Sequence, residues 1–162
     1  MRGLRVFAAV LVLTTCAGSA PARAQSRKPS AHEIAAIRDC AKKSEDNVDA
    51  GEGTCLFRLV AEPCMAPVGS AADRVMADCY QIEGAIWDAL LNENYRELLA
   101  ALDDEQVAKA RTMQRAWVAY RDTTCGFYYD KIRGSMAGFM EAACVARETA
   151  RRAMLLKFLT QL

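Results

Sequence analysis

Hydrophobic residues recur every three or four positions along most of the chain, and no stretch alternates regularly between apolar and polar residues. Such spacing places apolar side chains on one face of a helix, so the chain is expected to be helical. The longest pattern predicts a helix over about 71–101, with Gly84 or the polar stretch 92–94 as a candidate break. Trp87 is expected to anchor its core face, and the other expected inward residues are Val75, Cys79, Ile82, Ile86, Leu90, Tyr95, Leu98, Leu99 and Leu102.

Capping signals mark where two further helices begin. Ser30 followed by Glu33 forms a capping box, which predicts a first helix over about 31–47. Asp103 and the acidic residues after it suit the positive end of a helix and predict one that continues to about Tyr129. The apolar stripe of this later helix is expected to be Val107, Ala110, Met113, Trp117, Tyr120 and Thr124.

Glycine and proline divide the rest of the chain. A short helix is expected over 55–61, ended by Pro63 and followed by a loop over 64–69. Glycines predict a connection over 134–138 before a last helix over about 139–159. The inward candidates of that helix are Cys144, Val145, Met154, Leu155 and Phe158. The fold class predicted is all-α, a disulfide-stapled helical bundle with a long central helix.

Residues 1–24 have the features of a secretory signal peptide: a basic start, a short apolar run and a small-x-small pattern that ends at Ala24. The apolar run is too short to span a membrane. Lipid attachment at Cys16 is the competing interpretation, but Thr15 is a poor fit before a lipidated cysteine. The protein is therefore expected to be exported, either to the periplasm or out of the cell.

Two parts are expected after this leader: a helical, disulfide-bonded extension over 25–70 and a helical domain over 71–162. Together they comprise 138 residues with 18 basic and 20 acidic side chains, a net charge of −2. This mixed and slightly acidic composition gives no basic patch for nucleic acid or an anionic membrane. No segment after the leader is apolar enough to be a transmembrane helix.

Six cysteines remain after the leader, and an even number in an exported chain indicates disulfides. Six cysteines allow fifteen pairings. A faint repeat of Arg-Asp before a cysteine, at 38–40 and 121–125, favours local pairing. The pairs favoured in this way are Cys40–Cys55, Cys64–Cys79 and Cys125–Cys144.

Several classes of site find little support in the chain. His32 is the only histidine and no Cys-x-x-Cys pair occurs, which argues against a metal site and against dithiol redox catalysis. Nucleophilic catalysis lacks a plausible base, and no pair of carboxylates is singled out by its spacing. No catalytic residue, metal or cofactor is therefore assigned, and a binding protein is expected rather than an enzyme.

One ordered series of residues resembles a known family. The series comprises Cys79, Glu83, Trp87, Asn92, Tyr95, Gln114, Arg115, Trp117, Arg121, Asp122, Cys125, Gly134, Ser135, Cys144, Thr149 and Arg152. It is similar to the LprI-type lysozyme inhibitors, a family of small exported helical proteins, over about 79–156. The resemblance implies a lysozyme or another cell-wall lytic enzyme as partner. It carries over no inhibitory residue, so these motif residues are expected to hold the helices together.

The segment between Cys125 and Cys144 is the best candidate for a partner-binding surface. Aromatic, basic and glycine residues in a loop closed by a disulfide suit a protein contact. A lysozyme cleft contains two carboxylates, with which Lys131 or Arg133 is able to pair. The residues expected to contact a partner are Tyr128, Tyr129, Lys131, Arg133, Gly134 and Ser135. The alternatives are a simple helix–helix turn and a structural or interaction protein of the envelope that inhibits nothing.

Overall fold

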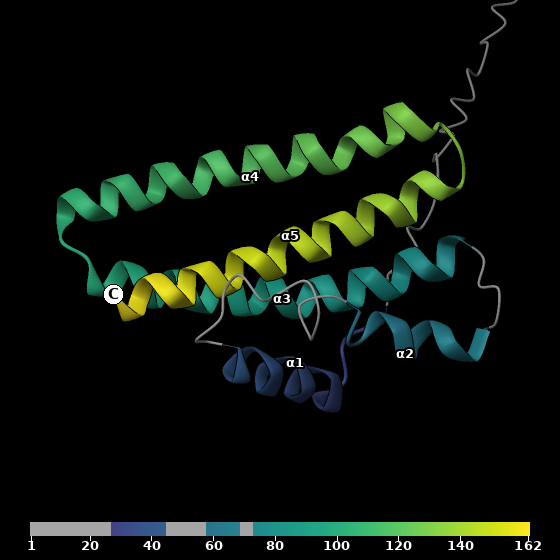
Figure 1. The fold of residues 1–162 in the computed structure, drawn as a ribbon, viewed down its shortest axis with the longest axis horizontal. Coiled ribbons are helices and arrows are strands. Elements are labelled where there is room, and N and C mark those ends of the chain that lie inside the picture. Colours follow the sequence, from purple (N-terminus) through teal and green to yellow (C-terminus); the bar gives the residue numbers. More distant parts are fainter. Residues whose placement is uncertain (1–26, 45–57, 69–72) are drawn as a thin grey trace, which may run out of the picture.

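A computed structural model describes residues 27–44, 58–68 and 73–162 of the protein. All regular structure in these ranges is helical, so the predicted all-α class is confirmed (Figure 1). The elements in chain order are α1 (Ala31–Lys43), α2 (Ala61–Met65), the 3₁₀ turn η1 (Ala66–Val68), α3 (Asp73–Ala101), α4 (Asp104–Ile132) and α5 (Met136–Gln161).

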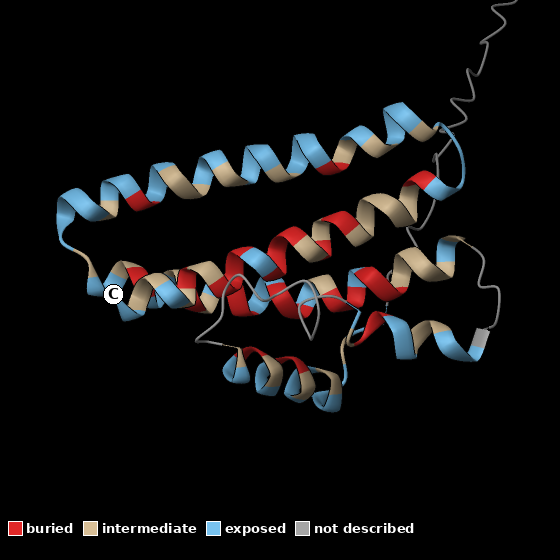
Figure 2. Cartoon of the chain, viewed as in Figure 1, coloured by how far each residue is buried: buried red, intermediate tan, exposed pale blue. Residues whose placement is uncertain are grey.

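The core lies where α3 and α5 pack side by side (Figure 2). The two helices run in the same direction, because Glu97 of α3 bonds to Lys157 of α5 while Gly84 lies against Ala146. Trp87 has no exposed surface and stands in the centre of this core, as predicted. Buried residues from both helices surround it, together with Ile37 and Ala41 from α1: Ile82, Ile86, Leu90, Leu91, Leu98, Ala150, Ala153, Met154 and Leu156.

The long helix α3 has 29 residues and is not broken at either candidate position. Gly84 instead lets α5 come close, since a Cβ placed on it would lie 3.5 Å from the Cβ of Ala146. Asn94 is buried, and its Nδ2 donates a 2.8 Å hydrogen bond to the backbone oxygen of Ala153. Gly84 and Asn94, the two candidate break positions, therefore both contribute to packing between α3 and α5.

Helix α4 forms an outer layer that packs mainly on α5 (Figure 1). Asp103 caps it in a capping box with Gln106, as expected, but the helix continues to Ile132, past the predicted end at Tyr129. Only Ala110 and Cys125 in it are buried. The predicted apolar stripe is wrong at its C-terminal end: Tyr120 is 53% exposed and Thr124 is exposed.

The reason is a change of step along α4. After Trp117 the inward face advances by four residues at a time through Arg121 to Cys125. A step of three residues from Trp117 to Tyr120, followed by one of four to Thr124, leaves that face. Because Arg121 is charged, the apolar pattern of the sequence does not indicate that it lies on the inward face.

The connection between α4 and α5 is shorter than predicted. It comprises residues 133–135, and Gly138 lies inside α5 rather than in the connection. Within α5 Cys144 and Met154 are buried as expected, Val145 and Leu155 are half-buried, and Phe158 is wrong, with 39% of its surface exposed.

The short N-terminal elements differ most from expectation. Residues 58–60 are not helical, α2 begins at Ala61 where a helix was expected to end, and residues 64–68 are helical rather than a loop. Pro63 lies in the first turn of α2. The first N–H groups of a helix have no partner within the helix, so a proline in the first turn removes no helical hydrogen bond. Residues 45–57, which include the predicted end of the first helix and the start of the short helix, lie outside the described residues.

One disulfide joins α2 to α3, and another joins α4 to α5. Cys64–Cys79 has a Cα–Cα distance of 5.8 Å, and Cys125–Cys144 has one of 5.5 Å. Both pairs are those favoured from local spacing. Cys40 is also disulfide-bonded, but the predicted pair Cys40–Cys55 falls partly outside the described residues because Cys55 does.

The predicted leader, the cleavage after Ala24 and Cys16 also lie outside the described residues. Within the ranges that are described, no helix combines the length and the apolar character needed to cross a membrane.

Candidate functional site

The end of the α4–α5 hairpin is a compact, exposed surface, which we call the tip and define as residues 127–136. Arg133 caps α4 in a left-handed conformation, with φ 50°, and its N–H donates to the backbone oxygen of Tyr129 at 3.2 Å. The N–H of Ala137 then donates to the oxygen of Gly134 at 3.0 Å. The chain thus reverses in three residues, and the buried Cys125–Cys144 disulfide ties the two helices just behind the tip.

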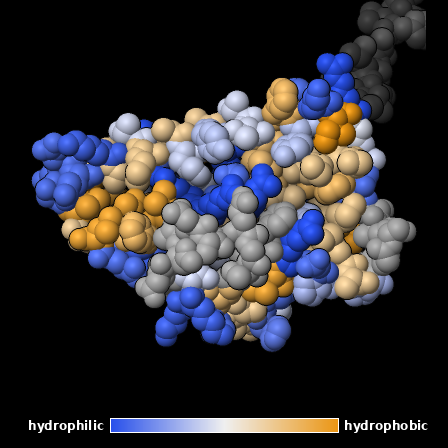
Figure 3. Space-filling view, viewed as in Figure 1, coloured by the Kyte–Doolittle hydropathy of each residue, from blue (hydrophilic) through white to orange (hydrophobic). Residues whose placement is uncertain are grey.

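Hydrophobic and basic side chains are exposed together at the tip. Phe127 is 60% exposed, Tyr129 53% and Met136 48%. Lys131, Arg133, Gly134 and Ser135 are exposed too, whereas Tyr128 is half-buried. Figure 3 shows hydrophobic atoms gathered at this end of the molecule and again near the C-terminus. The structure therefore brings the predicted contact residues together and leaves all but Tyr128 open to a partner.

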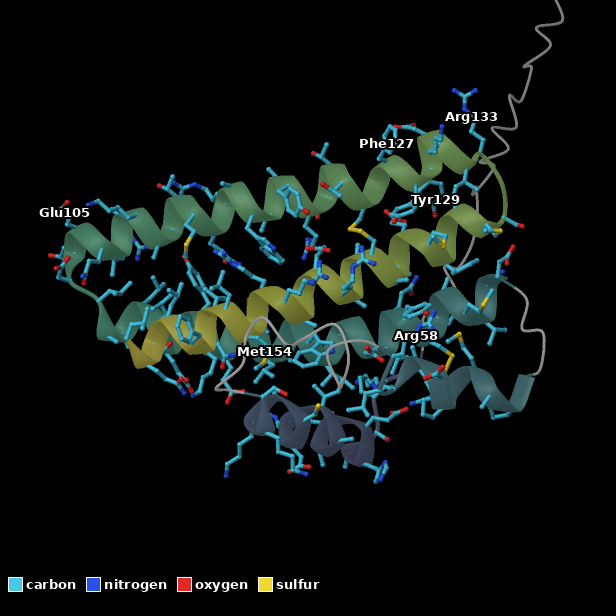
Figure 4. The ribbon with its side chains drawn as sticks, viewed as in Figure 1. Arg58, Glu105, Phe127, Tyr129, Arg133 and Met154 are labelled. Carbon is cyan, nitrogen blue, oxygen red and sulfur yellow. A yellow bond between two sulfur atoms is a disulfide. The ribbon has the colours of Figure 1, made fainter. Side chains whose placement is uncertain are left out.

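The labelled side chains at the tip point in different directions (Figure 4). Phe127 and Arg133 point away from the bundle, and Tyr129 lies on the side of α4 that faces α5. A Cβ on Gly138 would lie 3.4 Å from the Tyr129 hydroxyl, so that hydroxyl rests against the first turns of α5. The Nε of Arg133 donates to the backbone oxygen of Asp130 at 3.1 Å, which positions its guanidinium over the end of α4.

Farther along the hairpin, Trp117 lies between two arginines. The guanidinium carbon of Arg121 is 5.0 Å from the centre of its ring system, and that of Arg152 is 5.6 Å away. Both distances suit cation–π attraction. Arg152 also donates from Nε to Oε1 of Gln114 at 2.9 Å. Trp117 is half-buried and packs against the outside of the core, rather than inside it as predicted.

Arg152 is the least satisfied polar group in this layer. It is 6% exposed, its Nη2 has no hydrogen-bond partner, and burial lowers the pKa of the guanidinium. The indole N–H of Trp87 also has no partner. A buried donor without an acceptor is costly, so Arg152 in the α4–α5 layer and Trp87 in the α3–α5 core each lower the stability that their burial would otherwise give.

The other motif residues occupy structural positions. Nδ2 of Asn92 donates to the backbone oxygen of Asp88 at 2.8 Å, and Tyr95 packs against the core from its edge. Arg115 donates to the Thr112 hydroxyl at 3.0 Å on the exposed face of α4. Asp122 pairs with Arg121, and Thr149 is buried, with 1% of its surface exposed.

Glu83 belongs to the series that resembles the family, but sequence reasoning missed its structural role. It has no exposed surface, and its two carboxylate oxygens accept hydrogen bonds from three backbone N–H groups. Arg58 donates to Oε1 at 2.8 Å, and Val60 and Ala61 donate to Oε2 at 2.9 Å and 2.8 Å. The signal available in the sequence is a charged residue next to Ile82 and one turn before Ile86 and Trp87, on a face that is otherwise apolar.

No group of three or more His, Cys, Asp or Glu side chains in the described ranges is placed to hold a metal ion. His32 is exposed in the first turn of α1. Exposed surfaces available for recognition include the tip and the grooves beside α4.

Comparison with protein families matches the model described as "Lysozyme inhibitor LprI" to residues 64–156. Comparison with curated proteins gives no match, and comparison with solved structures gives none either. The matched range covers more than half of the chain and begins at Cys64, before the motif residues, so it includes both described disulfides and only the last two residues of α2. The chain therefore belongs to the LprI family of lysozyme inhibitors.

Proposed function

We propose that this protein is exported and inhibits a lysozyme or another cell-wall lytic enzyme through the tip of its α4–α5 hairpin. Membership of a family described as lysozyme inhibitors supports the activity. The exposure of Phe127, Tyr129 and Met136 beside two basic residues carries the assignment to the tip.

The tip has the composition and rigidity that protein contacts use. Aromatic and arginine side chains dominate the binding energy of most interfaces, provided that they become buried there. A three-residue connection and a disulfide hold these side chains in place before binding, which reduces the entropy lost on association. A partner thus meets a surface that is already ordered.

The charge of the tip suits the active site of a glycosidase. Such sites carry two carboxylates beside the scissile bond. Lys131 and Arg133 make no ion pair with another described residue and are free to pair with a carboxylate of the enzyme. Entry of one of them into the cleft would block the substrate and occupy the catalytic acid at the same time.

Export is supported by the leader-like residues 1–24 and by the disulfides, which persist in oxidising compartments. The expected extension over 25–70 overlaps the family match, which starts at Cys64. We therefore take α2 to belong with the inhibitor domain, because Cys64–Cys79 and Glu83 join it to α3.

The test measures lysis of purified cell walls by lysozymes of several types, in the presence of the disulfide-bonded protein expressed with its own leader. Inhibition is expected at micromolar concentration or below. Absence of inhibition against every type, with the disulfides verified by mass spectrometry, would contradict the activity. It would favour the alternative, an interaction protein of the envelope without inhibitory action.

Two matched pairs of variants test the tip itself. Tyr129→Ala is compared with Tyr120→Ala, because both tyrosines are 53% exposed on α4 and only Tyr129 lies at the tip. Arg133→Gln is compared with Arg111→Gln, an exposed arginine near the other end of α4. We expect each tip variant to weaken inhibition about tenfold or more and each control to leave it unchanged. Equal effects within a pair would exclude the tip as the contact surface.

A further inference from the structure

A groove of about 400 Å³ lies between α3 and α5, and Arg121 of α4 forms its wall. Along α3 it extends from Tyr80 to Asp88, and along α5 from Glu141 to Thr149. Nine residues of helix cover about 12 Å from first to last, so the groove is long enough for an extended segment of three or four residues.

Small residues form the floor of the groove. Gly84, Ala85, Ala142 and Ala146 line it, and the close approach of Gly84 to Ala146 keeps the floor low and apolar. A floor of this kind gives aliphatic carbon atoms a surface to cover, but by itself it selects no ligand.

Thr149 adds a polar group that has no hydrogen-bond partner among the described residues. Its side chain lines the groove although the residue is 99% buried, that is, 1% exposed. Its hydroxyl makes no hydrogen bond to any other described residue, whereas Thr112 and Thr160 each bond to a carbonyl of their own helix. Among the described residues, the fully buried side-chain nitrogen and oxygen atoms without a partner are Trp87 Nε1 and Arg152 Nη2. The Thr149 hydroxyl therefore reaches the groove, where an atom of a ligand is able to bond to it.

The charges along the groove are predominantly negative. Glu141 lies at one end and Asp88 at the other, and neither forms an ion pair with a described residue. The one cation of the lining, Arg121, already donates from Nε and Nη2 to Asp122 at 2.9 Å and 2.8 Å. Asp88 Oδ2 does accept a 3.0 Å hydrogen bond from Nδ2 of Asn92, which leaves its charge uncompensated. A ligand that enters therefore meets two carboxylates that have no cationic partner among the described residues, and a hydroxyl, above an apolar floor.

We propose that this groove binds a lysine or arginine side chain carried on an extended segment of a protein partner. Long basic side chains have an aliphatic stem and a charged head. The stem would cover Ala85 and Ala142, and the head would reach the carboxylate of Glu141 or Asp88. The groove is distinct from the tip, and its occupation does not require that the partner be a lytic enzyme.

A direct binding measurement tests the site. The probe is a capped five-residue alanine peptide with a central arginine, titrated into the isotope-labelled, disulfide-bonded protein and followed by NMR. We expect shifts of backbone amides within 80–88 and 141–149, and binding at least fivefold weaker when citrulline replaces arginine. A trimer of N-acetylglucosamine serves as the glycan probe. Shifts of these amides by the trimer and not by the peptide would overturn the proposal.

Variants separate the groove from general charge effects. Ala85→Leu fills the groove from an exposed position, so the fold is retained and peptide binding is expected to be lost. Asp88→Asn combined with Glu141→Gln is expected to weaken binding at least fivefold. Asp104→Asn combined with Glu105→Gln makes the same change of charge on exposed residues at the start of α4 and is expected to have no effect. Unchanged binding in Ala85→Leu, or no peptide-induced shift in the unmodified protein, would also overturn the proposal.

Discussion

The α3–α5 core carries an outer element on each side, and the two are attached in different ways. On one side, α2 is held by Cys64–Cys79 and by the buried carboxylate of Glu83, whose oxygens accept three backbone N–H groups. On the other, α4 is held by Cys125–Cys144 and by the buried guanidinium of Arg152, whose Nη2 has no partner. Each attachment combines one disulfide with one buried charged group, but only the first satisfies its polar atoms.

This difference indicates which side of the molecule is available for recognition. Phe127 and Tyr129 on α4 are large hydrophobic residues with more than half of their surface exposed. The unpartnered hydroxyl of Thr149 lies on the same side, in the groove that Arg121 bounds. A helix that is only partly packed on its neighbour keeps surface free for another protein, while the α2 side is packed for stability.

The largest effect is expected from Glu83→Gln, which tests the attachment of α2. The amide nitrogen of glutamine would face a backbone N–H where the carboxylate now accepts one, so at least one buried donor loses its partner. Loss of charged hydrogen bonds to buried groups is expected to reduce the free energy of unfolding by about 3 kcal/mol. Urea unfolding of the disulfide-bonded protein measures this free energy. Glu97→Gln, an exposed carboxylate of α3 paired with Lys157, is the control and should change it by less than about 1 kcal/mol.

Arg152→Met is the counterpart on the α4 side. The guanidinium makes one hydrogen bond, to Gln114, and its burial opposes the charged form, so an apolar side chain of similar length removes a cost along with a contact. We expect a change of less than about 1 kcal/mol. A loss as large as that of Glu83→Gln would contradict the contrast between the two attachments.

An intermediate effect is expected when the disulfide behind the tip is removed. Cys125→Ala combined with Cys144→Ala opens a loop with a sequence separation of 19 residues, which is expected to cost about 3 kcal/mol or less. Hydrogen exchange of amides in 126–136 is expected to accelerate far more than that of α3, since the disulfide orders the hairpin end locally. Equal acceleration of hydrogen exchange in 126–136 and in α3 would show that this disulfide supports the whole core rather than the tip.

Much of this architecture was predictable because its causes are local. The capping boxes at Ser30 and Asp103 and the apolar spacing of Ile82, Ile86 and Leu90 depend on residues within one or two turns of each other. The composition of the tip was also readable, because aromatic, basic and glycine residues follow one another there. Its exposure followed from its position between two helices.

The remaining features depend on residues far apart in the chain. Glu83 is buried only because residues 58–61 bring their N–H groups to it across a separation of more than twenty positions. Gly84 was expected to break a helix because its partner Ala146 is not evident from the local sequence. The groove arises in the same way, since three helices contribute its lining and each contribution alone resembles an ordinary helix face.

The smallest effect is expected at the exposed edge of the N-terminal side, where pH titrates the start of α1. Hydrogen bonds from Arg27, then from the backbone and side chain of Ser30, lower the pKa of Glu33 from 4.5 to about 2. The ionised carboxylate is favoured by folding, so its contribution is complete above pH 4.5 and is lost as the pH falls through about 2. Because Arg27 is half exposed, the change should remain below about 1 kcal/mol. Carbon-13 NMR of the Glu33 carboxyl measures the pKa. Ser30→Ala removes the hydroxyl that accepts from the Glu33 N–H and helps to lower this pKa, so it should raise the pKa slightly. A measured value near 4.5 would mean that this end of α1 is not capped in solution, and the satisfied character of the N-terminal side would then be confined to Glu83 and α2.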